Sequence, residues 1–204
     1  MAAPRTDRRP GFAPGDDRIE FLRGFLRKPK EVGSIIPSSR FLERRIIGSA
    51  EVGKARVVVE LGPGTGGTTR ALLRAMAPDA RLLAIEINPR FVRHLRTQVA
   101  DARLTVLEGS AADVGRVLAA EGLEGADVIL SGIPFSTMPR PLGLEILGAV
   151  REALRPGGRF VAYQFRDRVE ALGREVLGRP KIQTEIRNVP PMRVYTWERQ
   201  TRAS

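Results

Sequence analysis

The chain has 204 residues, of which 42% are hydrophobic, and its formal net charge is +11. This length predicts a single domain with enough surface to bury a sizeable core. The sequence contains no cysteine, which excludes disulfides, thiolate metal sites and a cysteine nucleophile. Its one histidine, His94, falls on the flank of an expected helix. A histidine triad or histidine metal site is therefore excluded, and we expect no metal.

The positive charge is concentrated at the two ends of the sequence. Residues 55–150 hold ten arginines and ten acidic residues, so the whole excess lies in residues 1–54 and 151–204. Basic ends around a neutral middle predict an anionic partner surface, either lipid or nucleic acid. The sequence shows no apolar signal segment and no run of eighteen apolar residues, so we expect a cytoplasmic protein, and a monomer.

The first residues predict a tail followed by an amphipathic helix. Residues 1–16 are rich in Pro, Gly, Asp and Arg, which is typical of a disordered tail. Residues 17–28 predict a helix that Pro29 stops, with apolar side chains in one arc and basic ones opposite. This pattern is typical of a helix in a membrane interface, and equally of a helix that packs on the core. The candidate membrane residues are Arg18, Phe21, Leu22, Arg23, Phe25, Leu26, Arg27 and Lys28.

A second N-terminal helix is expected from Ser39 to about Ile47, so that residues 17–50 form an amphipathic helical segment before the main domain. From Ala55 onward, strands alternate with helices. Strands are expected at 57–61, 81–86, 103–108, 126–131 and 158–165, and helices at 66–77, 89–100, 111–120, 140–154 and 166–178. Two last strands, about 181–188 and 192–199, enclose Pro190 and Pro191. The pattern predicts an α/β fold with a doubly wound, mostly parallel sheet of seven strands, closed by an antiparallel hairpin.

A ligand pocket is expected where the first two strands end. Glu60 ends one apolar run and opens E-L-G-P-G-T-G, and Glu86 ends the next run. The glycines allow a sharp turn and a close approach of the ligand to the backbone, and Glu86 is placed to accept hydrogen bonds from ribose hydroxyls. The candidate cofactor residues are Glu60, Gly62, Gly64, Thr65, Gly66, Glu86 and Ile87, with Ser110, Ala111 and Ser131 from the next two strand ends.

Two cofactor classes fit this spacing, because Gly62, Gly64 and Gly67 also satisfy the dinucleotide fingerprint G-x-G-x-x-G. A pyrophosphate needs free backbone N–H groups and no nearby carboxylate, whereas Pro63 removes one donor and Glu60 adds a negative charge. S-adenosylmethionine has no phosphate, and a carboxylate attracts its sulfonium and ammonium groups. We therefore expect S-adenosylmethionine, against the alternative of a glycine turn in some other α/β enzyme.

Two further strand ends complete the expected pocket. After the third strand, backbone groups of Ser110 and Ala111 are placed to contact an adenine ring, although Ser110 can also simply cap a helix. The fourth strand ends in S-G-I-P-F (131–135), and here the chain resembles the amino-directed class I methyltransferases, whose motif is Asn or Asp followed by X-Pro-aromatic. Gly132 departs from that motif, because it lacks the polar side chain that would contact a planar nucleobase amine.

Together with S-I-I-P-S-S (34–39), Y-Q-F (163–165) and N-V-P-P-M-R-V-Y (188–195), these motifs resemble the short bacterial phospholipid N-methyltransferases over residues 18–199. The resemblance implies stepwise methylation of phosphatidylethanolamine to phosphatidylcholine. It implies S-adenosylmethionine as donor, with S-adenosylhomocysteine as product, and peripheral attachment to the inner face of the cytoplasmic membrane. It also places the methyltransferase domain in residues 51–204.

The expected chemistry needs few reactive groups, because methyl transfer requires mainly that an amine be held in line with the sulfonium methyl while water is excluded. The catalytic candidates are Ile133, Pro134, Phe135 and Tyr163. Phe135 and Tyr163 are suited to cation–π contact with a methylated ammonium, and Tyr163 to orienting the amine or helping to take its proton. Both are equally interpretable as core aromatics. The candidates for binding the lipid phosphate are Arg40, Arg187 and Arg193.

Two other functions remain to be weighed. The ribosomal RNA adenine dimethylases share the fold, the X-Pro-aromatic turn and a basic surface. Gly132 and the lack of room for an appended RNA-binding domain favour a lipid over a nucleic acid. A membrane-binding module without catalysis is disfavoured, because the glycines and both glutamates of the pocket are intact.

Overall fold

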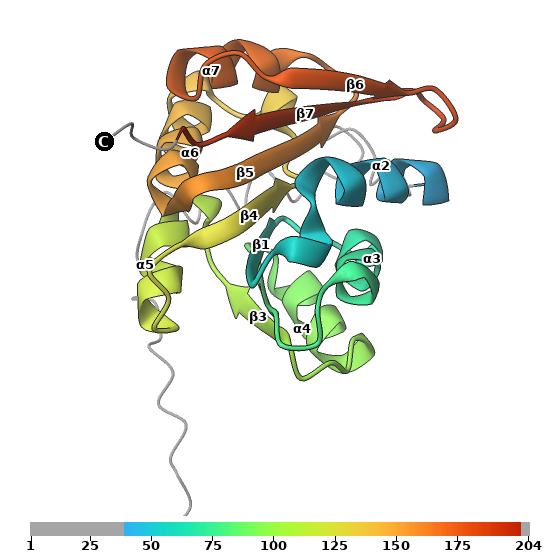
Figure 1. Cartoon of the computed structure of the whole chain (residues 1–204), viewed down its shortest axis with the longest axis vertical. Helices are drawn as coiled ribbons and strands as arrows, with labels where there is room; N and C mark the ends of the chain where they lie inside the picture. The colour runs from blue at the N-terminus through green and yellow to red at the C-terminus, as the bar shows by residue number, and fades with distance from the viewer. Residues whose placement is uncertain (1–38, 201–204) are drawn as a thin grey trace, which may run out of the picture.

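The computed structural model describes residues 39–200, which form one α/β unit around a seven-stranded sheet (Figure 1). The strand order is β3-β2-β1-β4-β5-β7-β6, and only β7 runs antiparallel to its neighbours. The strands are β1 (Val57–Leu61), β2 (Arg81–Glu86), β3 (Leu104–Glu108), β4 (Ala126–Ser131), β5 (Leu154–Gln164), β6 (Lys181–Glu185) and β7 (Met192–Glu198). The predicted doubly wound sheet with a closing antiparallel hairpin is confirmed.

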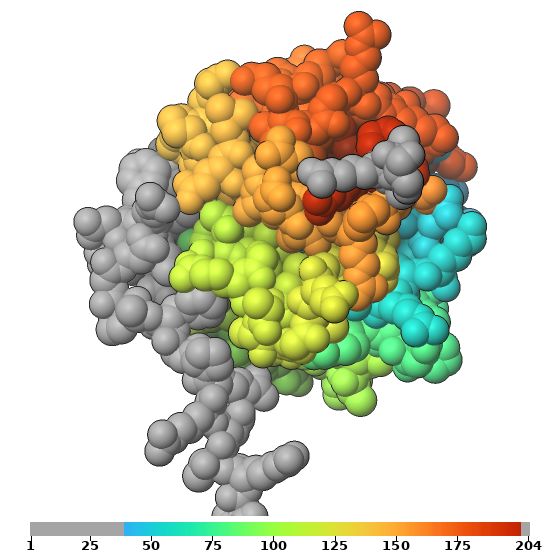
Figure 2. All heavy atoms as spheres, turned by 60° about the vertical axis from the view of Figure 1, so that its left-hand side comes forward, coloured from blue at the N-terminus to red at the C-terminus, as the bar shows by residue number. Residues whose placement is uncertain are grey.

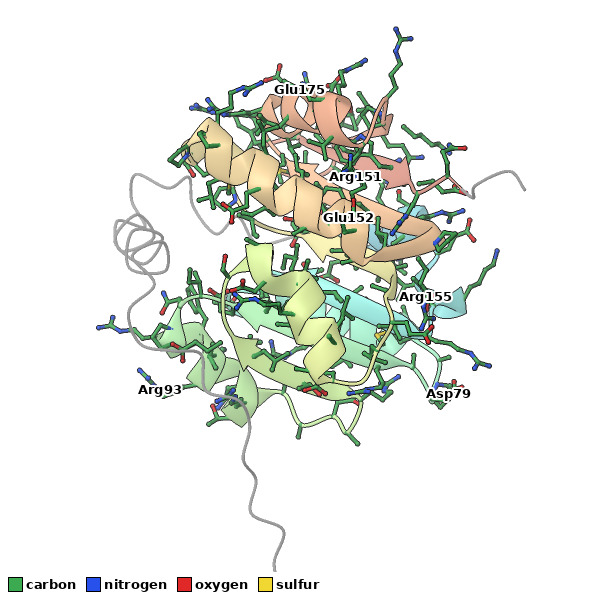
Figure 3. All side chains as sticks on the ribbon, turned by 90° about the vertical axis from the view of Figure 1, so that its left-hand side faces the viewer. Asp79, Arg93, Arg151, Glu152, Arg155 and Glu175 are labelled. Atoms are coloured by element: carbon green, nitrogen blue, oxygen red, sulfur yellow. The ribbon has the colours of Figure 1, made fainter. Side chains whose placement is uncertain are left out.

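Helices cover both faces of the sheet. They are α2 (Arg40–Ala50), α3 (Gly67–Ala75), α4 (Pro89–Gln98), α5 (Val114–Ala120), α6 (Arg140–Ala153) and α7 (Arg168–Val176). The space-filling view shows α5, α6 and α7 adjoining as one continuous outer layer, coloured yellow-green to orange (Figure 2). Arg151, Glu152 and Glu175 lie on the outside of this layer (Figure 3). The helices thus bury their apolar stripes on the sheet and leave their charges in solvent.

The core follows the two-residue period of the strands. In β1, Val57, Val59 and Leu61 pack in the cluster that contains α5, α6 and α7, whereas Val58 packs with α2 and α3 on the other face. Because successive side chains of a strand point to opposite faces, Glu60 lies on the same face as Val58. The chain thereby directs a carboxylate toward α3 at the end of its most buried strand.

Several boundaries differ from the sequence prediction, and the strand expected over about 181–188 ends at Glu185. Strand β5 begins at Leu154, directly after α6, and an irregularity in its pairing with β4 accommodates Pro156 and the following glycines. The helix expected over 111–120 is a short 3₁₀ turn (Ala111–Asp113) followed by α5. Ser39 is the N-cap of α2, which continues to Ala50. Pairing partners and caps decide these details, and hydrophobic periodicity does not report them.

Within residues 39–200, no helix is long and apolar enough to cross a membrane. The predicted tail (1–16) and the predicted amphipathic helix (17–28) lie outside the described residues.

The packing of two helical glycines generates a stability prediction. A Cβ added at Gly173 in α7 would lie 2.3 Å from Cζ2 of the buried Trp197, whereas one at Gly148 in α6 would have nothing within 4 Å. We expect Gly173→Ala to destabilise the fold by about 1–3 kcal/mol through overpacking. Gly148→Ala should instead gain roughly 0.5–1 kcal/mol of helix propensity. Urea unfolding of both variants checks this, and equal midpoints would contradict the packing of α7 on Trp197.

Candidate functional site

The turn after β1 depends on glycines in left-handed conformations. Gly62, Gly64 and Gly66 have φ angles of 72°, 57° and 83°. A Cβ at Gly66 would lie 2.5 Å from Leu95 Cδ2 and one at Gly62 would lie 3.0 Å from Ile133 Cγ1, so close packing adds to the preference for glycine that the positive φ angles impose. At Gly64 a Cβ would meet nothing within 4 Å, which leaves open space on the concave side of the turn. A ligand can therefore approach the backbone most closely at Gly64.

Glu86 closes this turn from the neighbouring strand. Its carboxylate accepts hydrogen bonds from Gly64 N (3.1 Å) and Asn88 N (2.8 Å), and the residue is only 5% exposed. Burial raises the pKa of Glu86, and the backbone donors partly offset that effect. The carboxylate therefore fixes the shape of the turn and still has lone pairs for hydroxyl donors of a ligand.

Glu60 has an unsatisfied hydrogen-bonding atom. The residue is 1% exposed, and its Oε2 accepts a 2.6 Å hydrogen bond from Thr69 Oγ1 of α3. Its Oε1 is buried and has no hydrogen-bond partner in the described part of the chain. Burial, and then the nearby charge of Glu86, raise the pKa of Glu60 to about 7. A buried carboxylate oxygen without a donor, next to an open glycine turn, fits a ligand that brings a positively charged donor.

The other cofactor candidates lie around the same edge of the sheet. Ser110 Oγ accepts from Ala112 N and so caps the turn after β3, as the capping alternative expected. Ser131 is fully buried, and its Oγ accepts from Ile133 N. The side chains of Ile87 and Ala111 are buried, whereas Thr65 is exposed at the tip of the glycine turn. These residues shape the pocket through backbone and packing, and Glu60 and Glu86 supply its charge.

The hydroxyl of Tyr163 lies next to Gly132, in the space that a side chain at this position would need. A Cβ at Gly132 would lie 2.7 Å from the Tyr163 hydroxyl, so a larger side chain and this hydroxyl exclude each other. The hydroxyl is 3.2 Å from Thr68 Oγ1 in α3. Burial, followed by the charge of Glu60, raises the pKa of Tyr163 above its usual value. The raised pKa favours the protonated phenol, which is suited to orienting a polar group, and a role of Tyr163 in taking a proton stays a prediction.

The position of Phe135 bears on its two interpretations. Its side chain is fully buried in the core with Met138 and Leu172, and it begins a 3₁₀ turn (Phe135–Thr137). A fully enclosed ring does not present its face to a substrate, so the alternative interpretation as a core aromatic is the one that the structure supports. Ile133 and Pro134 are partly exposed in the same turn, and Gln164 donates to the Ile133 carbonyl.

The three candidate phosphate ligands are separated into two places. The guanidinium groups of Arg40 and Arg187 both lie over the ring of Phe41, at 5.0 and 4.2 Å from its centroid. Arg187 also pairs with Glu185, at 2.9 Å. Arg193 lies on β7, 3.9 Å from Asp167. Arg40 and Arg187 thus form one cationic cluster, and Arg193 does not join it through any contact within residues 39–200.

Sequence reasoning missed Thr68, Thr69 and Gln164, which connect the elements of the site. A signal for the two threonines was present, because polar residues in the first turn of a buried helix after a glycine turn are placed to contact a strand end. Gln164 gave no such signal, since its partner is a backbone carbonyl 31 positions away.

The titration of Glu60 generates a prediction for the ligand-free protein. Its pKa of about 7 lies above the ordinary 4.5, so the folded state binds more protons than the unfolded chain between these values. The stability that this provides is present below pH 4.5 and is lost as the pH rises through 7. We expect the melting temperature to fall between pH 5 and 8, and to fall less in Glu60→Gln. Calorimetry checks this, and parallel curves would show that Glu60 titrates normally.

Comparisons with known proteins agree with this geometry. A family model described as a methyltransferase domain matches residues 59–160. The ornithine lipid N-methyltransferase of Singulisphaera acidiphila is 33% identical over 181 residues, which are 88% of this chain and 94% of that protein. The ribosomal RNA small subunit methyltransferase A of Nocardia farcinica is 31% identical over 179 residues, 84% of this chain but only 58% of that protein.

Solved structures show the same fold at low identity. The N-methyltransferase NodS of Bradyrhizobium japonicum superposes with a TM-score of 0.65 at 14% identity, covering 81% of this chain and 98% of that one. The 1,6-didemethyltoxoflavin-N1-methyltransferase of Burkholderia thailandensis, solved with S-adenosylhomocysteine, gives 0.64 at 17%, covering 98% and 99%. With its glycine turn, its two buried glutamates and a near full-length relative, the chain belongs to the S-adenosylmethionine-dependent methyltransferases.

Proposed function

We propose that this enzyme methylates the primary amine of a membrane aminolipid, and that phosphatidylethanolamine is its substrate, methylated stepwise to phosphatidylcholine. The single observation that carries the lipid assignment is the relative that acts on a lipid, because the match extends over nearly the whole of both chains. The matched methyltransferases of ribosomal RNA contain a large additional part that this chain does not match.

The cofactor residues complement the charge and the shape of S-adenosylmethionine. S-adenosylmethionine supplies a methyl group on a sulfonium, together with an ammonium and two ribose hydroxyls. Glu86 is placed to accept from the hydroxyls, the Gly64 turn allows the close approach, and the free Oε1 of Glu60 is suited to the ammonium. The ammonium would satisfy the buried oxygen, which supports placing it at Glu60.

The substrate amine belongs near Tyr163. Side chains alternate across β5, so Tyr163 faces the same side of the sheet as Val161, which packs in the cluster with Val58, and therefore the same side as Glu60. Its phenol keeps its proton and offers an oxygen lone pair that can accept from the amine and orient its nitrogen. The amine must arrive neutral to attack the methyl carbon, and the proton that it releases after transfer leaves to water.

A zwitterionic head also needs a cation for its negative group. The cluster of Arg40 and Arg187 over Phe41 is our candidate, because guanidinium binds phosphate through two parallel hydrogen bonds. An ornithine head has a carboxylate as well as an amine, and the same cluster suits that negative group. Ornithine lipid is therefore the second candidate, and the relative favours it specifically.

We also propose that the protein works at the inner face of the cytoplasmic membrane. The basic amphipathic pattern of residues 17–28 supports attachment there, and the chain carries an excess of positive charge suited to anionic lipid. A lipid substrate requires an enzyme that reaches the headgroup layer without leaving water.

The role of Glu86 is testable with a conservative variant. Glu86→Gln keeps the size of the side chain and removes its charge, so each hydrogen bond to a ribose hydroxyl loses about 1.5–3 kcal/mol of charge assistance at most. We expect binding of S-adenosylmethionine to weaken at least tenfold, measured by calorimetric titration. Glu124→Gln, the same change at an exposed glutamate outside the candidate site, serves as the control and should bind within twofold of the parent. Equal affinity of a folded Glu86→Gln protein would remove this residue from the cofactor site.

The substrate is tested with a labelled methyl donor. We expect mono-, di- and trimethylated products from phosphatidylethanolamine in anionic vesicles, and no label in total RNA. A parallel incubation with ornithine lipid vesicles separates the two lipid candidates. Label in ornithine lipid alone would replace phosphatidylethanolamine by the second candidate. Label in RNA with both lipids inert would overturn the lipid assignment.

A further inference from the structure

Four large hydrophobic residues are exposed in the described part of the chain: Phe165 (55%), Ile182 (41%), Ile186 (75%) and Val189 (89%). Single exposed apolar side chains are normal on a protein surface. Three of these, however, lie at one end of the sheet. Gln164 pairs with Arg193, and Glu185 pairs with Met192, so Phe165, Ile186 and Val189 all lie just beyond the last paired residues of adjacent strands.

That end of the sheet is also the end that carries the cofactor site. β5 is parallel to β4 and β1, so Phe165 follows the same edge as the strand ends that bear Glu60 and Ser131. Figure 1 shows the turn between β6 and β7 projecting beyond the strands, next to the start of α2. An apolar projection therefore lies at the same edge of the sheet as the cofactor site.

The turn is held in place by buried polar side chains. Asn188 is 1% exposed; its Oδ1 accepts from Ser39 N (2.9 Å), and its Nδ2 donates to the Pro190 carbonyl (3.0 Å). Glu185 is equally buried and accepts from Arg45 Nε (3.0 Å). The turn thus buries an amide and a carboxylate while it exposes isoleucine and valine, which reverses the usual distribution. This reversal is favourable where the turn faces an apolar environment.

Arginines lie near the exposed apolar residues. Arg187 lies in the turn itself and Arg40 shares its contact with Phe41, whereas Arg166 and Arg168 follow Phe165 as exposed residues, with the exposed Asp167 between them. Glu185 is already paired with Arg45 and Arg187. Apolar side chains near arginines match the interface of an anionic bilayer, where the former enter the acyl boundary and the latter meet phosphates.

From these observations we propose that the β6–β7 turn (residues 186–191), together with Phe165, inserts into the interface of an anionic membrane and seats the mouth of the site on the headgroup layer. The inference rests on the proposed function, because an enzyme of lipid headgroups needs this orientation. The N-terminal segment 17–28 would be a separate anchor. It joins the described chain at Ser39, which is bonded to this same turn.

The test measures partition onto vesicles of phosphatidylglycerol and phosphatidylcholine that contain no amine substrate. The double variant Ile186→Asn with Val189→Asn should bind at least tenfold more weakly than the parent, because two exposed apolar side chains no longer leave water. Ile182→Asn is the matched control, since Ile182 is exposed on β6 but paired with Tyr195, away from the turn. It should bind within twofold of the parent.

A gain-of-signal measurement covers the case in which the double variant fails to fold. Val189→Trp places a fluorophore at the tip, and we expect its emission to shift to the blue when these vesicles are added. Unchanged partition of a folded double variant, or no shift in Val189→Trp, would overturn the proposal. Because the vesicles contain no substrate, failure of phosphatidylethanolamine methylation would leave these outcomes unaffected, and calorimetry with S-adenosylmethionine reports separately on the cofactor site.

Discussion

Two carboxylates buried at neighbouring strand ends are the constraint on which the rest of the site depends. Glu60 and Glu86 are both nearly inaccessible; burial raises the pKa of each, and the charge of Glu86 raises the pKa of Glu60 further. The ligand-free chain neutralises this cost only in part, through one threonine and two backbone donors. In the function that we propose, a cationic cofactor satisfies the free oxygen of Glu60, so that its binding also stabilises the fold at this point.

The strands farthest from the two glutamates, β6 and β7, are held by contacts with α2. α2 is tied to β6 through Arg45 and Glu185, and to the β6–β7 turn through Ser39 and Asn188. The close pairing with Arg187 and Arg45 lowers the pKa of Glu185 to about 2, so the link persists at any physiological pH. The elements that we assign to the lipid surface are therefore as firmly positioned as those of the cofactor pocket.

The sequence predicted the sheet and the cofactor end of the site because both follow from local patterns. Each of these patterns can be recognised within a few residues of sequence: the apolar runs that end in Glu60 and Glu86, and the spacing of the glycines. The wall of the substrate pocket depends on contacts between distant strands, and there the sequence left two interpretations of each aromatic residue open. Nothing near Phe135 reveals that its ring turns into the core, and nothing near Gly132 reveals that Tyr163 reaches it from β5. The role of the N-terminal helix remains a prediction.

The contact between Gly132 and Tyr163 has a consequence for how such sites diverge. In this chain the polar group next to Gly132 is the hydroxyl of Tyr163, which belongs to β5. In the nucleobase-directed motif the polar group is the Asn or Asp side chain that follows β4. A Cβ at 132 would lie 2.7 Å from the hydroxyl, so a side chain there requires Tyr163 to move or to be replaced by a smaller residue. A relative with Asn or Asp at the position of Gly132 should therefore have either a smaller residue in place of Tyr163 or a tyrosine turned away from β4.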